Sequence, residues 1–249
     1  KSYQLKDLKE IEFKDLWGDN GVFTTMWIFD NPSKILFFKK HINNLIKSSK
    51  AYSIFKTSLK TDILNLLRVN LNSRTKYNHL LRIALNKKIL SISLRKRIKP
   101  NLNFELKLVN LKRQKPEFKN LKYKEILKHL SKLDNSKIDI GLCSNNKIFE
   151  TGTSNLLFIK DDRVFSPANK FYKGINYKFF KSKLKKIIKK DIMINSLNKF
   201  DEIILIGSGK GVASVKTINQ IRWKRKSFKY YKILSKYYKS AVSSCKIYR

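Results

Sequence analysis

Two periodicities of apolar residues alternate along the chain and predict a mixed α+β protein. A spacing of three to four residues, typical of helices with one buried face, occurs in segments 42–52, 61–68, 123–133, 175–190 and 227–242. Short runs rich in β-branched and aromatic residues, typical of strands, cover 22–28, 35–38, 79–85, 89–95, 138–143, 147–150, 155–160, 163–166 and 202–206. The two patterns predict a chain that builds sheets and covers them with helices.

A polar stretch near the middle of the sequence predicts a division into two domains. Residues 99–117 contain Pro100 and Pro116 and show little apolar periodicity. We therefore expect a small N-terminal α+β domain at 1–105, a linker at 106–117 and a larger domain at 118–249. In the larger domain, the dipeptides Asn145-Asn146 and Asp161-Asp162 are turn signals between short strands and predict a strand meander.

Length and composition exclude several classes of protein. A chain of 249 residues with 42% hydrophobic residues can bury a core and is not disordered. No apolar run approaches the ~20 residues of a membrane-spanning helix, and the N-terminus lacks a signal-peptide pattern. Cys143 and Cys245 lie far apart, which predicts reduced thiols in a cytoplasmic protein. The first residue is Lys1 and not Met, so we expect a truncated chain.

The net charge of +38 has two interpretations. A basic surface attracts nucleic acid or an anionic membrane. However, lysine and arginine are spread evenly along the chain, lysine outnumbers arginine 46 to 10, and asparagine and isoleucine are also abundant. These residues have A/T-rich codons, so we interpret the charge as compositional drift with solvated lysines on every face. A polyanion-binding protein remains the alternative.

The few glycines indicate where the backbone turns sharply or approaches a ligand. Of 8 glycines, five fall at expected junctions between strands, loops and helices: Gly152, Gly174, Gly207, Gly209 and Gly211. Gly174 precedes a predicted helix, where free amides can bind an anion. The turn at 207–211 predicts a second cradle of backbone N–H groups. It lacks the Walker A spacing, and an ordinary strand-ending turn is the alternative.

An ordered set of motifs carries a family resemblance. Lys119, Leu121 and Tyr123 form a K-x-L-x-Y motif, Glu150 follows Lys119 by 31 residues, and Asn155 follows five residues later. The triplet Gly174-Ile175-Asn176 comes next. This order resembles the class IV pyridoxal-phosphate enzymes, a family of branched-chain aminotransferases, D-amino-acid aminotransferases and aminodeoxychorismate lyases.

The resemblance implies a role for each of these residues. Lys119 would form the Schiff base with pyridoxal 5'-phosphate and later transfer protons, as a desolvated lysine can. Glu150 would keep the pyridine nitrogen protonated, and Tyr123 would bind the phenolic oxygen of the cofactor. The remaining cofactor-binding residues implied by the resemblance are Asn155, Gly174, Ile175, Asn176, Gly207 and Ser208.

The N-terminal part also resembles the family, with departures. Residues 21–25 (Gly-Val-Phe-Thr-Thr) are similar to a Gly-x-Phe-Glu-Thr strand, and the Thr-Thr variant is more similar to the lyases. Residues 41–45 are similar to a His-(Ile/Leu)-x-Arg-Leu motif, but Asn44 replaces the arginine that would hold the cofactor phosphate. Trp27 replaces another position that is often basic. Lys173 or Lys210 is a candidate to supply the missing charge.

These observations lead to one expected fold and three functional hypotheses. The fold would be the two-domain class IV aminotransferase fold (fold type IV), with a barrel-like sheet in the larger domain and the cofactor bound between the domains of a homodimer. Transamination of an amino acid with a 2-oxo acid is the first hypothesis. The alternatives are aminodeoxychorismate lyase chemistry on the same site, giving 4-aminobenzoate, and a relative that has lost the cofactor and binds polyanions. His41, His79 and His129 are isolated, and no zinc or calcium spacing is present.

Overall fold

The computed structural model describes residues 1–248, which group into two compact units. The first unit contains Lys1–Arg97, Phe118–Lys124 and Ser244–Arg249, and the second contains Ile98–Glu117 and Glu125–Ser243. The first unit therefore takes its chain from three separate stretches. This grouping differs from the expected boundaries in that Lys119 and Tyr123 belong with the N-terminal strands.

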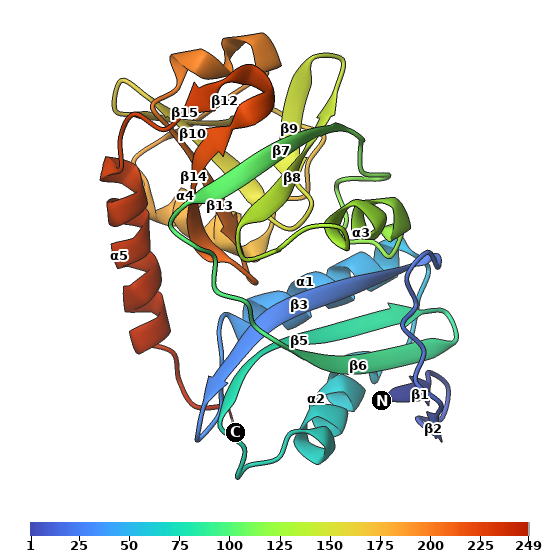
Figure 1. Cartoon of the computed structure of the whole chain (residues 1–249). Coiled ribbons are helices and arrows are strands. Elements are labelled where there is room, and N and C mark those ends of the chain that lie inside the picture. The colour runs from blue at the N-terminus through green and yellow to red at the C-terminus, as the bar shows by residue number, and fades with distance from the viewer. Residues whose placement is uncertain (249) are drawn as a thin grey trace. The chain divides into compact units, whose positions relative to one another are not determined.

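A six-stranded antiparallel sheet forms the centre of the first unit (Figure 1). Its strands, in spatial order, are β2 (Glu10–Ile11), β1 (Ser2–Gln4), β6 (Ile89–Lys96), β5 (Tyr77–Asn86), β3 (Gly21–Asp30) and β4 (Lys34–Ile35). β3 and β5 pair along their whole length, from Gly21 opposite Asn86 to Asp30 opposite Tyr77. Burial alternates along β3 only between Thr24 and Ile28, whereas the first four residues of the strand are all buried, so both faces of the strand are covered there.

Two helices cover one face of this sheet, α1 (Phe38–Ala51) and α2 (Leu59–Asn70). Their buried residues, including Ile42, Leu45 and Ile63, form one core with Met26 and Ile28 of β3. Because side chains alternate along a strand, Phe23 and Thr25 lie on the opposite face. That second face carries the polar and aromatic residues described below.

The segment Phe118–Lys124 is held against β3 by main-chain hydrogen bonds. The amide of Phe23 donates to the carbonyl of Lys119 at 2.9 Å, and the amide of Leu121 donates to the carbonyl of Gly21 at 2.9 Å. A Cβ atom at Gly21 would lie 2.3 Å from the carbonyl oxygen of Leu85 and 2.7 Å from a methyl of Leu121. Only glycine leaves room for both neighbours here.

A curled nine-stranded sheet forms the second unit (Figure 1). Its strands, in spatial order, are β12 (Ile187–Lys190), β11 (Arg163–Pro167), β10 (Asn155–Lys160), β13 (Glu202–Gly207), β14 (Gly211–Ile218), β7 (Phe104–Asn110), β8 (Ile138–Ser144) and β9 (Lys147–Thr151), and β15 (Trp223–Lys224) pairs with β14. Its core contains Phe104, Phe158, Phe200 and Trp223. The mixed α+β architecture confirms the predicted fold class.

Helices complete the second unit, and a buried carboxylate fixes the start of the longest one. They are α3 (Lys124–Leu130), α4 (Ile175–Lys183), α5 (Lys229–Ser243) and the 3₁₀ helices η1 (Ile194–Lys199) and η2 (Asn219–Ile221). The fully buried carboxylate of Glu202 accepts the amides of Tyr230 and Tyr231 at 2.8 and 2.9 Å, and the hydroxyl of Ser227 at 3.0 Å. A carboxylate thus satisfies first-turn donors of α5 where the helix dipole favours negative charge.

Three sequence-based expectations about elements were wrong in detail. The expected linker at 106–117 begins inside strand β7 (Phe104–Asn110), whose Phe104 and Leu106 are fully buried. The helix predicted at 175–190 ends at Lys183, and Ile187 and Ile188 instead pair in parallel with β11. The predicted meander is two hairpins, β8–β9 and β10–β11, separated in the sheet by β13, β14 and β7. Each difference arises from pairing between distant strands, which local patterns do not encode.

Candidate active site

Lys119 lies on the polar and aromatic face of the first unit. Its amine is 4.9 Å from the centre of the Phe23 ring, a distance at which an ammonium is attracted to the ring face. Its main chain is fixed by the hydrogen bond from Phe23 described above. The amine position therefore depends on β3, the strand that carries the family-like residues 21–25.

His41, on α1, is the electrostatic neighbour of Lys119. The imidazole is buried, and its Nδ1 lies 2.8 Å from the hydroxyl of Thr24. Burial lowers the pKa of His41 to about 3, and the positive charge of Lys119 contributes to the same shift. The imidazole is therefore neutral at neutral pH. It packs near Lys119 and bonds Thr24 without placing a second positive charge beside the lysine amine.

Tyr123 shares the aromatic surroundings of Lys119. Its ring is buried, stacks on Trp17 with centroids 5.4 Å apart, and meets Phe23 edge to face at 5.8 Å. Because Phe23 contacts both Lys119 and Tyr123, the first unit brings these two predicted site residues together. Aromatic packing of this kind fixes ring orientation and excludes water.

Arg82 is a buried cation on the same face that the sequence reasoning did not single out. It lies opposite Thr25 in the β3–β5 pair, forms an ion pair with Asp15, and lies 4.3 Å from the Trp17 ring centre. Its Nη1 is buried with no hydrogen-bond partner among the described residues. Burial lowers its pKa, an effect that Asp15 opposes. The sequence did contain a signal for this buried cation, because Arg82 interrupts the otherwise apolar run 80–85.

Glu150, at the C-terminal end of β9, is held in the second unit by Arg113. The Nε of Arg113 donates to Oε1 at 2.8 Å, and Nη2 donates to Oε2 at 3.3 Å. Both side chains are buried, with 4% and 3% of their surfaces exposed. An arginine fork of this kind favours the ionised carboxylate and fixes its plane. A carboxylate has about four lone-pair sites, so it can accept further donors.

Arg113 was missed because residues 106–117 were interpreted as a linker. The sequence offered one signal, since arginine is rare in this chain, at 10 against 46 lysines. Bidentate pairing to a buried carboxylate requires the planar guanidinium and cannot be supplied by lysine. An arginine in a lysine-rich chain is therefore a candidate for such a role.

Asn155 holds the turn in front of α4. Its Oδ1 accepts the amide of Gly174 at 3.1 Å, and its Nδ2 donates to the carbonyl of Tyr172. A Cβ atom on Gly174 would lie 2.9 Å from the same Oδ1, so this close approach requires glycine. The sequence predicted a cofactor contact for Asn155, but both ends of its amide are engaged with this turn. These two contacts hold Gly174 in place, and the cofactor contact of Asn155 stays a prediction.

The N-terminus of α4 is the predicted anion site, and it has the features of one. Gly174 caps the helix without a side-chain hydrogen bond, and the first turn contains no acidic residue. Only 2% of the surface of Asn176 is exposed, and both its Oδ1 and its Nδ2 lack a hydrogen-bond partner among the described residues. A buried amide without a partner costs about 1–3 kcal/mol. A phosphate at this helix end would remove part of that cost.

The Gly-rich turn carries Ser208 between β13 and β14. Gly207 packs so closely on the loop between β9 and β10 that a Cβ atom would lie 2.6 Å from Oγ of Ser154. Lys210, in the same turn, had been considered as a substitute for the missing phosphate-binding arginine. Its amine instead points into the second unit, 3.1 Å from the carbonyl of Asn135 and 3.9 Å from Oδ2 of Asp139. Lys173 is exposed beside Gly174.

The two departures from the family pattern both lie in the first unit. Asn44 is half-buried on α1. The indole of Trp27 donates to Asn78 at 3.0 Å, and the guanidinium of Arg97 lies 3.9 Å from its ring centre. Trp27 therefore forms part of a cation–π pair on β3. A positive charge is present at this position through Arg97.

The predicted site residues thus form two groups. Lys119 and Tyr123 belong to the first unit, and Glu150, Asn155, Gly174, Ile175, Asn176, Gly207 and Ser208 belong to the second. Among residues 1–248, no cluster of three or more His, Cys, Asp or Glu side chains has the geometry of a metal site. No helix in the described part of the chain is long and apolar enough to cross a membrane.

Solved structures of aminotransferases have the same fold as this chain. A branched-chain aminotransferase from Thermoproteus uzoniensis with norvaline superposes with a TM-score of 0.76 at 14% identity, covering 97% of this chain and 94% of that one. An aminotransferase from Brucella abortus bound to the cofactor PLP gives 0.76 at 16% identity, covering 98% and 99%. At these identities the likeness shows the fold.

A protein assigned as a 4-amino-4-deoxychorismate lyase from Legionella pneumophila has the same fold. It gives a TM-score of 0.71 at 16% identity, covering 94% of this chain and 98% of that chain. No curated protein sequence matches the chain significantly. The sequence profile of the family described as Amino-transferase class IV matches residues 21–218. The match spans most of the sequence, and the chain therefore belongs to the class IV aminotransferase family.

Proposed function

We propose that the protein is a pyridoxal-phosphate enzyme that transfers the amino group of an amino acid to a 2-oxo acid. Family membership and the cofactor-bound neighbours support pyridoxal phosphate as the cofactor. The observation that carries the proposal is the buried Glu150–Arg113 pair, because a carboxylate kept ionised in the interior is what a protonated ring nitrogen requires.

The residues of the chain fit this cofactor in three respects. The cofactor, when bound, supplies an aldehyde and a ring that withdraws electrons from the substrate. Lys119 offers an amine on an aromatic surface for covalent attachment, and Glu150 offers a fixed negative charge. The α4 N-terminus, with its partnerless Asn176 amide, offers donors for a phosphate without a dedicated cation.

The chain's own residues also account for proton handling. Lys119, released from the cofactor when substrate binds, would hold and return the proton that moves during transamination. His41 stays neutral beside it because burial lowers its pKa to about 3, so it does not compete for that proton. Tyr123, packed between Trp17 and Phe23, would direct its hydroxyl to the cofactor oxygen. Arg113 would keep Glu150 ionised throughout the cycle.

Lyase chemistry on aminodeoxychorismate is the second candidate. The sequence Thr24-Thr25 on β3 favours it, since this variant is more similar to the lyases of the family. In the structure these two threonines face opposite sides of the sheet. Thr24 forms a hydrogen bond with His41, whereas Thr25 lies opposite Arg82 on the face that carries Phe23.

The homodimer implied by the family resemblance is also part of the proposal, and sedimentation analysis tests it.

Borohydride trapping tests the proposed cofactor and the lysine that binds it. Purified protein is incubated with pyridoxal phosphate, reduced with borohydride, and digested for peptide mass mapping. We expect a pyridoxyl group on Lys119 and none in Lys119→Ala, whereas Lys122→Ala, a change of an exposed lysine in the same segment, should keep the label. A label on another lysine would disprove the assignment of Lys119, and no label at saturating cofactor would disprove the cofactor.

Activity assays then separate the two reactions. The parent protein is supplied with a panel of amino acids and 2-oxo acids, and separately with aminodeoxychorismate. Formation of a new amino acid supports transamination. Release of 4-aminobenzoate without an amino-group acceptor supports the lyase. Cofactor labelling without either product would exclude both reactions for this chain.

A further inference from the structure

Lys210 is the single buried lysine among residues 1–248, although the chain contains 46 lysines. It lies in the Gly-rich turn, two residues after Ser208. Its amine donates to the carbonyl of Asn135 at 3.1 Å, lies 3.9 Å from Oδ2 of Asp139, and lies 4.7 Å from the Phe104 ring centre. Burying a lysine amine is costly unless an anion and hydrogen bonds compensate, so this contact set requires an explanation.

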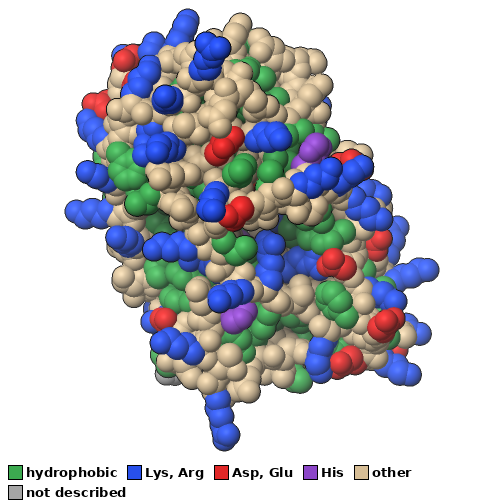
Figure 2. Space-filling model, in the orientation of Figure 1, with side chains coloured by type: hydrophobic (Ala, Val, Ile, Leu, Met, Phe, Trp, Pro, Cys, Tyr) green, Lys and Arg blue, Asp and Glu red, His purple; other side chains and the backbone are tan. Residues whose placement is uncertain are grey.

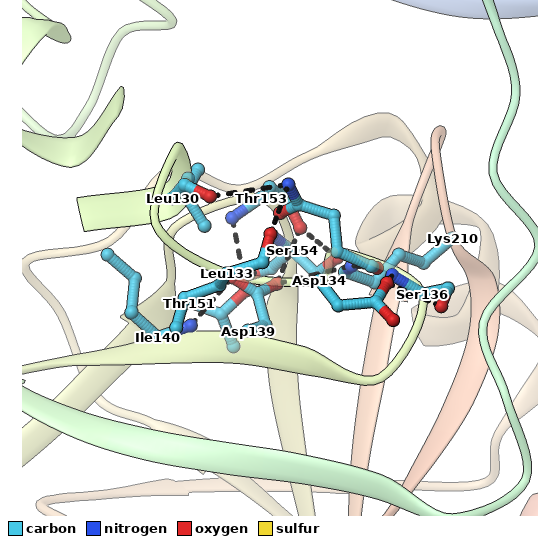
Figure 3. A network of polar contacts seen from close by, with 11 residues as sticks. Leu130, Leu133, Asp134, Ser136, Asp139, Ile140, Thr151, Thr153, Ser154 and Lys210 are labelled. Atoms are coloured by element: carbon cyan, nitrogen blue, oxygen red, sulfur yellow. Dashed lines mark hydrogen bonds and ion pairs between the residues drawn. The ribbon is translucent and has the colours of Figure 1, made fainter. Parts of the chain in front are cut away.

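Asp139, at the start of β8, is the anion and is completely buried. Its Oδ2 accepts the hydroxyls of Thr151 at 2.9 Å and Thr153 at 2.6 Å, and its Oδ1 accepts the amide of Ile140 at 2.8 Å. Figure 3 shows these side chains converging on Asp139, with Lys210 approaching from the Gly-rich turn. One carboxylate thus holds both the loop after β9 and the turn after β13.

The loop at 151–154 connects two predicted site residues, because it begins directly after Glu150 and ends directly before Asn155. Two glycines allow it to pack tightly. A Cβ atom on Gly152 would lie 3.2 Å from Oδ1 of Asp139, and one on Gly207 would lie 2.6 Å from Oγ of Ser154. The segments that carry Glu150, Asn155 and Ser208 therefore share one buried polar network.

We propose that Lys210 and Asp139 form a buried charge clamp that holds the Gly-rich turn in the conformation in which Ser208 binds the cofactor phosphate. Lys210 is a positioning residue and not a phosphate ligand, because its amine is directed to Asp139 and Asn135. The inference rests on the proposed function, since it assumes that the anion bound by the turn is pyridoxal phosphate. The clamp would keep the Gly-rich turn ordered, which a solvated surface lysine could not do.

The test measures cofactor affinity and turn mobility in the full-length protein. The variants are Lys210→Met, Asp139→Asn, the double variant, and Lys216→Met as a control for an exposed lysine on β14. Pyridoxal phosphate is titrated into each apoprotein and followed by absorbance. Hydrogen exchange of residues 207–211 is measured without cofactor, and urea unfolding gives the stability of each apoprotein.

We expect Lys210→Met to weaken cofactor binding about tenfold, which corresponds to about 1.4 kcal/mol, and to speed exchange in the turn. Asp139→Asn, which keeps the side-chain shape, should show the same two effects if Lys210→Met does not fold. The double variant should lose no more affinity than either single variant, because the two residues act as one unit. Lys216→Met should match the parent protein.

Three results would overturn the inference. Lower stability of Lys210→Met with unchanged cofactor affinity would mean that the clamp is purely structural. Additive losses in the double variant would mean that the two residues act separately. If the parent protein itself does not bind pyridoxal phosphate, the proposed function fails and this inference fails with it. If the parent protein and the variants all bind the cofactor equally well, only the clamp is disproved.

Discussion

Three cations are buried within residues 1–248, and each faces a carboxylate. Arg82 pairs with Asp15, Arg113 with Glu150, and Lys210 with Asp139. A buried charge is tolerated only with such a partner. In a chain with 56 lysine and arginine residues, burial therefore identifies three cations with a structural task, while Lys119, the proposed cofactor-binding lysine, is only partly buried.

The buried pair around Glu150 gives the first prediction. Glu150→Gln removes the negative charge required at the ring nitrogen, so turnover should fall ~100-fold or more while the cofactor still binds. The same change leaves Arg113 without its counter-charge, and unfolding free energy should fall by about 3 kcal/mol. Turnover, cofactor titration and urea unfolding measure the three effects.

A double variant separates catalysis from stability at this pair. Arg113→Met together with Glu150→Gln removes both charges, so part of the lost stability should return because no buried charge is left unpaired. Turnover should remain low, since the negative charge is still absent. Recovery of turnover in the double variant would contradict the catalytic role of Glu150.

His41 gives a prediction about pH. Its pKa is about 3 in the folded protein, against 6.5 for an unperturbed imidazole. Between these values the unfolded chain binds a proton that the folded chain does not, so stability falls as pH decreases from 6.5 toward 3. The slope from one such group is at most ~1.4 kcal/mol per pH unit.

Substitution of His41 isolates its share of this slope. Urea unfolding at a series of pH values should give a shallower acid loss for His41→Gln than for the parent protein. His129→Gln, a change at a half-buried histidine on α3, should keep the parent slope. Equal slopes for all three proteins would mean that the pKa of His41 does not differ between the folded and the unfolded protein.

At the scale of elements, the start of α5 depends on a carboxylate from the neighbouring strand β13. Glu202→Gln would retain an acceptor but lose the charge that faces the helix N-terminus. We expect a loss of about 1–3 kcal/mol in unfolding free energy, the range for a buried hydrogen bond to a charged group. Hydrogen exchange at 230–233 should become faster in parallel.

Glu125→Gln provides the matched control for this helix start. Glu125 is an exposed acid in the first turn of α3, so its loss should cost only a few tenths of a kcal/mol, about the lower limit for a surface helix-dipole interaction. If both variants lose the same stability, the buried contacts of Glu202 would have no special importance.

The sequence predicted most helices and strands because their apolar spacing agrees with local geometry. It missed β7, where lysine and asparagine dilute the alternation of Phe104, Leu106 and Leu108, and this omission concealed Arg113. It placed Lys210 near a phosphate because charge alone suggests that role, whereas its direction depends on Asp139, distant in sequence. Ordered motifs predicted Lys119 and Glu150 as site residues, and this stays a prediction, whereas the contacts that hold the two side chains come from segments distant in sequence, which the motifs do not show.

At the scale of the whole molecule, lysine and arginine side chains are scattered over the visible face without a single dominant patch (Figure 2). A net charge of +38 repels itself in the compact state. Salt should therefore stabilise the protein, and its Tm should rise as KCl increases from about 0.01 M to about 0.5 M, because the Debye length shortens about seven-fold. Sucrose at matched osmolality controls for excluded-volume effects.

Nucleic-acid binding is the alternative reading of the same charge, and it is tested in parallel. Fluorescence anisotropy with a single-stranded oligonucleotide over the same salt series gives the affinity and its slope. Weak, sequence-independent binding that disappears at moderate salt fits solvated lysines. Tight binding combined with a constant Tm would contradict the drift interpretation and favour a polyanion-binding protein.

The three-part composition of the first unit has a consequence for synthesis on the ribosome. Residues 118–124 complete the edge of β3, and residues 244–248 add a bridge from Ile247 to Lys34 and a ring contact between Tyr248 and Phe38. The strands formed by residues 1–97 therefore leave the ribosome early but lack their last partners until residues 244–248 have been translated. All residues of the second unit have been translated before those last partners, so the part encoded later can be the first to reach its complete fold.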